Sequence, residues 1–127
     1  MTRRQKAILY LTYLIVYSDG EYDESEKSAV DYIRSQEGVS DDDYQQFLID
    51  VQNISERELY ERAMAMIDEC PSHEDKLSVF VWLYKLSEVD GTVHAKEVRF
   101  LLYSLKKVGV DFEEVKEASD KVPPITI

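Results

Sequence analysis

Two short stretches of the chain combine acidic residues with a glycine in the same order. They read DGEYDESE at residues 19–26 and DGTVHAKE at residues 90–97. In both, an apolar residue stands two positions after the glycine, and a glutamate stands seven residues after the aspartate. This spacing matches the second half of an EF-hand loop, where the glycine permits a sharp turn and the glutamate binds calcium through two oxygens. The chemistry indicated is the binding of a hard divalent cation.

Neither stretch is a complete calcium loop. The first ligand positions would fall on Ile15 and Tyr17 in one copy, and on Leu86 and Glu88 in the other. We expect these residues to lie in buried helices, so the full EF-hand interpretation fails.

A cation would nevertheless explain why an aspartate stands at the end of each preceding helix. The C-terminus of a helix carries partial negative charge, which an acid there makes less favourable unless a cation lies beside it. Oxygen ligands of this kind suit Ca²⁺ or Mg²⁺ rather than zinc. The predicted ligands, brought together from both stretches, are Asp19, Asp23, Glu26, Asp90 and Glu97.

The same acids also have an interpretation without metal. Asp-Gly pairs favour turns, and the glycines are natural helix C-caps. Asp23 and Glu26 fit a capping box, whereas Glu97 fits one poorly because His94 is a weak N-cap. Under this alternative, the chain is a protein-interaction or dimerisation domain with no metal site.

The elements that must position these acids are helices throughout. Glycine, proline and capping residues predict about seven, including residues 3–18, 23–37 and 94–108, and we see no convincing strand pattern. The others open at Ser40, Ser55, Ser72 and Asp111. The first and fifth are apolar on most sides and are expected at the centre. Two inward stripes are predicted: Leu59, Ala63, Met66, Ile67 and Cys70 in the fourth helix, and Val98, Leu101, Leu102, Leu105 and Val108 in the sixth.

A shift of 71 residues superimposes one part of the chain on another without a gap. Tyr13 then matches Tyr84, and the two acidic stretches and the later Gly-Val pairs also coincide. The repeat predicts a duplicated helical hairpin with a pseudo-two-fold, whose halves span about residues 7–44 and 78–115. Both belong to one domain, residues 1–122, and residues 123–127 form a tail.

Composition narrows the classes of function. The chain has 127 residues and a net charge of −11, which disfavours nucleic-acid binding. The apolar run near the N-terminus is too short to span a bilayer and lacks a cleavage site, so we predict a cytoplasmic protein without membrane insertion. Cys70 and His73 are separated by the helix-stopping Pro71, and no catalytic set appears, so we predict no enzyme.

With these residues in view, the chain resembles the tellurite-resistance TerB-like family, whose domain also forms the N-terminus of the co-chaperone DjlA. The resemblance rests on the paired acid-Gly turns, each followed by its glutamate, and on the turns GVS at 38–40 and GVD at 109–111. It covers about residues 4 to 120. The chain departs from the pattern of this family in two ways. Ser18 and Val89 stand where the family commonly has alanine before the aspartate, and His94 stands where it has an acid or a small polar residue.

The resemblance implies an all-α fold around two central helices. It also implies an acidic, cation-binding surface linked to bacterial stress or to metal-related complexes. We therefore predict a non-enzymatic stress-response or metal-resistance-associated module that binds a divalent cation weakly and docks onto partner proteins. Whether it forms a homodimer is left open.

Overall fold

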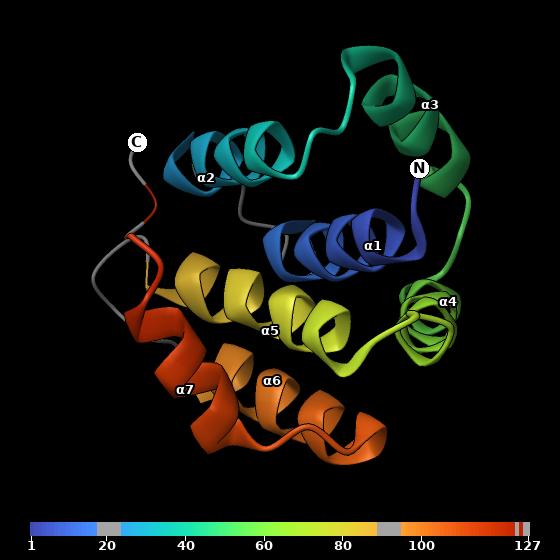
Figure 1. The fold of residues 1–127 in the computed structure, drawn as a ribbon. Coiled ribbons are helices and arrows are strands. Elements are labelled where there is room, and N and C mark those ends of the chain that lie inside the picture. The colour runs from blue at the N-terminus through green and yellow to red at the C-terminus, as the bar shows by residue number, and fades with distance from the viewer. Residues whose placement is uncertain (18–23, 89–94, 124, 126–127) are drawn as a thin grey trace.

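The computed structural model describes residues 1–17, 24–88, 95–123 and 125 of the chain. Within these residues it contains seven α-helices and no strand, which confirms the predicted all-α class (Figure 1). The helices are α1 (Arg3–Tyr17), α2 (Glu24–Gln36), α3 (Asp41–Val51), α4 (Glu56–Asp68), α5 (His73–Ser87), α6 (Ala95–Val108) and α7 (Phe112–Asp120).

Helices α1 and α5 form the centre of the molecule, as their apolar sequences predict. They pack against each other, α4 packs on α1, and α7 packs on α5 (Figure 1). Each central helix buries apolar side chains on more than one side, among them the consecutive residues Ile8 and Leu9 in α1, and Phe80 and Val81 in α5. A helix buried on several sides must be apolar nearly all round, which is the pattern that these two sequences show.

Side-chain caps fix where most of the helices begin. The Ser40, Ser55 and Ser72 hydroxyls each accept a hydrogen bond from the backbone N–H three residues later, at the starts of α3, α4 and α5. Asp111 accepts from the Glu113 N–H at the start of α7. Such caps satisfy backbone donors that the helix itself leaves unpaired. The predicted helix starts at these four residues are therefore confirmed.

Several element boundaries recur 71 residues apart, as in the sequence repeat. Helices α2 and α6 begin at Glu24 and Ala95, and α3 and α7 begin at Asp41 and Phe112. Gly38 and Gly109 have φ angles of 73° and 75°, the left-handed conformation that commonly ends a helix. These agreements support a duplicated hairpin, while the pseudo-two-fold relation between the halves stays a prediction.

The predicted inward stripe of α4 was partly wrong. Leu59, Ala63, Ile67 and Cys70 are buried, but the buried methionine is Met64 rather than Met66, which is only partly buried. Met64 is buried because α4 has a second neighbouring helix, α6, in addition to α1. Met64 lies one helical turn after Tyr60, whose hydroxyl contacts Ser104 of α6 at 3.2 Å. Because α4 packs on α6 as well as on α1, its buried face is wider than a single stripe.

The stripe predicted for α6 was also wrong at one described position, while the Val98 side chain lies outside the described residues. Leu101 and Leu105 are buried, but Leu102 is 44% exposed. The buried face of α6 includes Ser104 instead, which is fully buried and in hydrogen-bond contact with the Tyr60 hydroxyl. A serine was not expected inside because burying a hydroxyl is unfavourable without a partner, and the sequence does not show that Tyr60 supplies one.

Candidate functional site

The predicted cation ligands fall where the structure gives no side-chain geometry. Asp19, Asp23 and Asp90 lie outside the described residues. Glu26 and Glu97 belong to α2 and α6, but their side chains are likewise outside the described part. Convergence of the five acids therefore stays a prediction.

The described helices nonetheless set the frame for such a site. Helix α1 ends at Tyr17, two residues before Asp19, and α5 ends at Ser87, three residues before Asp90. The two helices pack together, and their C-terminal ends lie on the same side of the molecule in Figure 1. Each acidic stretch therefore begins within three residues of the C-terminal end of a central helix, and these two ends lie on the same side.

No alternative metal centre is present in the part of the chain that the structure describes. Among these residues, no group of three or more histidine, cysteine, aspartate or glutamate side chains could hold an ion. A site built from at least three such side chains must therefore include residues beyond those described, and the two acidic stretches are the candidates that the sequence offers.

A small hollow lies between α1, α2 and α3. Thr12 and Tyr13 line it from α1, Lys27 from α2, and Tyr44 and Phe47 from α3. It has room for about one water molecule, far less than a cofactor or organic substrate needs. We therefore assign it no ligand.

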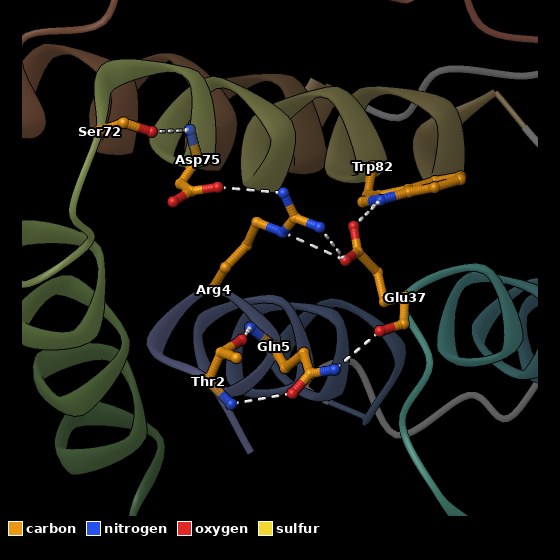
Figure 2. Close-up of polar contacts among 7 residues, drawn as sticks. All are labelled: Thr2, Arg4, Gln5, Glu37, Ser72, Asp75 and Trp82. Carbon is orange, nitrogen blue, oxygen red and sulfur yellow. Dashed lines mark hydrogen bonds and ion pairs between the residues drawn. The ribbon is translucent and has the colours of Figure 1, made fainter.

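A polar network joins α1, the end of α2 and α5, close to the N-terminal end of the central pair (Figure 2). The Arg4 guanidinium lies between two carboxylates. Its Nη2 contacts Glu37 Oε2 at 2.8 Å, and its Nη1 contacts Asp75 Oδ1 at 3.0 Å. Burial alone would lower the pKa of Arg4, but the two carboxylates outweigh it and raise that pKa above its ordinary value. Arg4 therefore keeps its charge and links two helices to its own.

Glu37 is the centre of this network. Its side chain is only 6% exposed, and its second oxygen accepts from the Trp82 indole N–H of α5 at 2.7 Å. The Gln5 side-chain amide donates to the Glu37 backbone carbonyl at 2.7 Å. A nearly buried carboxylate is tolerated only when paired and hydrogen-bonded, and Glu37 meets both conditions. The network holds the C-terminal end of α2 against the central helices.

Sequence reasoning did not identify this network. Ser72 was expected to open α5, and its Oγ does accept a hydrogen bond from the Asp75 N–H at 3.1 Å. The carboxylate of Asp75, however, contacts Arg4. One available signal was the Thr2-x-x-Gln5 spacing of a capping box, which the structure forms with hydrogen bonds in both directions. No local sequence pattern indicates that Glu37 and Trp82, which lie 45 residues apart in the chain, become hydrogen-bond partners.

Cys70 and His73 take structural positions. Cys70 is 8% exposed, and its thiol donates to the Met66 carbonyl oxygen. Burial raises the pKa of this thiol above its ordinary value, which makes it a poor nucleophile at neutral pH. His73 is the first residue of α5, and its Nε2 contacts Glu114 Oε2 at 2.8 Å. The expectation that Cys70 belongs to the core is confirmed.

Comparison with known proteins identifies the family. The sequence profile of the family described as Tellurite resistance protein TerB matches residues 5–120, nearly the whole chain. Comparison with curated proteins found no match, and comparison with solved structures found none either. Among the described residues, no helix has both the length and the apolar character needed to cross a membrane. With its all-helical fold and a match from residue 5 to residue 120, the chain belongs to the tellurite resistance protein TerB family.

Proposed function

We propose that this protein is a non-enzymatic module, associated with stress response or metal resistance, that binds one divalent cation weakly and docks onto protein partners. The family match carries the proposal, because a TerB domain fits a tellurite-resistance-associated module and is generally a non-catalytic helical domain. The proposed ligands are the predicted acids Asp19, Asp23, Glu26, Asp90 and Glu97.

The chemistry of these acids favours calcium or magnesium. Carboxylate oxygens are hard ligands, which these two cations prefer. The packed helices α1 and α5 support a shared site, because both acidic stretches follow from the same end of the pair. Two half-loops offer fewer ligands than one complete EF-hand, so we expect a Kd on the order of 10⁻⁴ M.

The remaining parts of the proposal follow from composition. A net charge of −11 disfavours nucleic acid as a partner. The single cysteine, Cys70, is free and buried, which suits a reducing compartment, and we propose a cytoplasmic location. Cys70 and His73 contact other groups, so they support no nucleophile-base pair.

The test is a thermal melt of the full chain in calcium chloride and in sodium chloride at matched ionic strength. At a hundredfold excess of calcium over Kd, binding should stabilise the fold by about 2.7 kcal/mol. For a domain of this size that is a rise in Tm of roughly 8 to 16 °C. Any divalent cation also screens the negative charge, so the sodium control defines the baseline.

Three variants make the test specific. Glu26→Gln and Glu97→Gln each remove one ligand charge while keeping the size of the side chain. Glu56→Gln is the matched control, because Glu56 is also an acid in the first turn of a helix but lies outside both acidic stretches. We expect the first two to lose most of the calcium-specific shift and the control to keep it.

The alternative function makes the opposite prediction. If Glu26→Gln and Glu97→Gln both keep the full calcium-specific shift, the acids act only as caps and turn residues. The protein would then be an interaction or dimerisation domain without a metal site.

A further inference from the structure

Exposed apolar side chains in the described residues are concentrated on two helices. The large ones are Met1, Ile49, Leu102 and Tyr103. Ile49 on α3 is 59% exposed, and Leu102 and Tyr103 on α6 are 44% and 61% exposed. Single exposed apolar residues need no explanation, but an aromatic and an aliphatic side chain together on one helix face indicate a contact surface.

The outward face of α6 is basic as well as apolar. Leu102, Tyr103, Lys106 and Lys107 are all exposed and recur at helical spacing, so they form one stripe, which we call the α6 face. Leu101 and Leu105 on the other side of the helix are buried. Two lysines in its last turn give this face the opposite sign to a protein whose net charge is −11.

Contacts with α4 hold the α6 face in shape. The ring of Tyr103 lies 6.2 Å from the ring of Tyr60, and the Lys107 ammonium lies 5.3 Å from the same ring. The Tyr60 hydroxyl is in hydrogen-bond contact with Ser104. Side chains that are already ordered lose less conformational entropy when a partner binds, so this face is suited to recognition.

The outward face of α3 is complementary in charge. Asp42, Gln45, Gln46, Ile49 and Asp50 are all exposed and lie on one stripe, the α3 face. Phe47 and Val51 on the opposite side are buried. The α3 face therefore presents an isoleucine flanked by carboxylates, where the α6 face presents leucine and tyrosine flanked by ammonium groups.

We propose that the α6 face of one copy of this chain binds the α3 face of a second copy. Helices α3 and α6 lie at opposite margins of the molecule in Figure 1, so one copy cannot join its own two faces. Contact between two different faces is head-to-tail, and it leaves one α3 face and one α6 face free on every pair. Association therefore continues beyond the dimer.

The strength of this contact follows from its size and charge. Each face offers only a few side chains, which is typical of a weak, reversible interface, with a Kd on the order of 10⁻⁴ M. The net charge of each copy opposes association. At 0.15 M salt, however, charges beyond about 8 Å are screened, so the adjacent lysine-aspartate pairs dominate. The proposal deepens the docking part of the proposed function and is independent of its cation site.

The experiment is sedimentation equilibrium of the full chain at rising concentration in 0.15 M salt. Wild type should show an apparent mass that rises past that of a dimer. Ile49→Ser disables only the α3 face, and Leu102→Ser disables only the α6 face, so each variant alone should remain monomeric. An equimolar mixture of the two should form a 1:1 dimer and stop there, because only one intact pair of faces is left. Unchanged circular dichroism and Tm would show that both variants fold.

Charge reversal gives a second test. Lys106→Glu should abolish association, and adding Asp50→Lys to the same chain should restore it, because every contact then pairs the two reversed charges. The proposal is overturned if wild type is monomeric throughout, if either serine variant still associates, or if their mixture stays monomeric. The calcium-specific Tm shift of the serine variants should equal that of wild type, so failure here is distinguishable from failure of the cation site.

Discussion

Glu37 joins three helices through one carboxylate that is almost fully removed from solvent. It follows α2, one of its oxygens pairs with Arg4 of α1, and the other accepts from Trp82 of α5. Removing one member of a largely buried ion pair usually costs more than the pair contributed, and Arg4 would then keep only its contact with Asp75. The ends of these helices are therefore linked through the side chain of a single residue.

Glu37→Gln should lower the free energy of unfolding by about 1–3 kcal/mol, because the amide can still accept from Trp82 but no longer neutralises Arg4. The measurement is urea unfolding at neutral pH. The matched control is Glu69→Gln. Glu69 pairs with Arg3, which lies on α1 next to Arg4. Both side chains of that pair are about half exposed, so its loss should cost less than about 1 kcal/mol. Equal effects of the two variants would contradict a special role for Glu37.

Cys70 should react slowly with a thiol-specific disulfide reagent while the protein is folded. The thiolate is the reactive form, and burial raises the pKa of this thiol, so less thiolate is present at any given pH. The sulfur must also wait for local opening of the fold. We expect a rate at least about tenfold below that of the urea-unfolded chain at pH 8. Equal rates would show that Cys70 is accessible.

The raised pKa of Cys70 also makes the stability of the fold depend on pH in the alkaline range. A raised pKa in the folded state means that the protonated thiol is favoured there, so its contribution is complete below the ordinary value of 9.0. The contribution is lost as pH rises through the folded value. Wild type should therefore lose more stability than Cys70→Ser above pH 9. Tyr84, whose pKa burial also raises, is present in both proteins and does not affect the difference.

At the scale of the element, Gly38 and Gly109 end matching helices in the same left-handed conformation. A Cβ built on either meets no atom within 4 Å, so a substitution is strained only through the backbone. Gly38→Ala and Gly109→Ala should each cost about 1–2 kcal/mol, measured by urea unfolding. Gly38→Asn should cost less, since asparagine adopts this conformation more readily. A larger loss for asparagine than for alanine would mean that side-chain crowding, not φ, sets the cost.

The helix ends were predictable because their signals are local. Ser40, Ser55, Ser72 and Asp111 cap helices through backbone groups two or three residues away, and the glycines act on their own φ. The apolar period of α1 and α5 also sufficed to place them at the centre. These features do not depend on which distant segment lies alongside.

The burial predictions were wrong where contact with a segment distant in the sequence determines which side chains are buried. Met64 is buried and Leu102 exposed because α4 and α6 meet through Tyr60 and Ser104, residues 44 apart in the chain. Glu37 and Trp82 likewise become partners only after α2 and α5 pack together. Of the candidate cation site, the sequence supplies ligand types and spacing, but convergence depends on how the two halves are placed relative to each other.

At the scale of the whole molecule, the central pair α1 and α5 connects two ends of different character. Near their N-terminal ends, Arg4 compensates Glu37 and Asp75. From their C-terminal ends, the sequence continues into acidic stretches in a chain of net charge −11. Self-repulsion of such a charge destabilises the compact state. Salt should therefore act on the repulsion of the whole molecule more than on the buried pair.

Raising sodium chloride from 0.01 to 0.15 M shortens the Debye length from about 30 to about 8 Å. We expect Tm to rise by about 5 °C, the equivalent of about 1 kcal/mol for a domain of this size. The destabilisation by Glu37→Gln should change little with salt, because its side chain is nearly buried, whereas that by Glu69→Gln should shrink. A Tm that falls with salt would show that attraction between surface pairs outweighs the repulsion of the net charge. In that case the Tm of the sodium chloride control in the calcium experiment would also fall with ionic strength. A rise in Tm caused by calcium would then be easier to distinguish from screening.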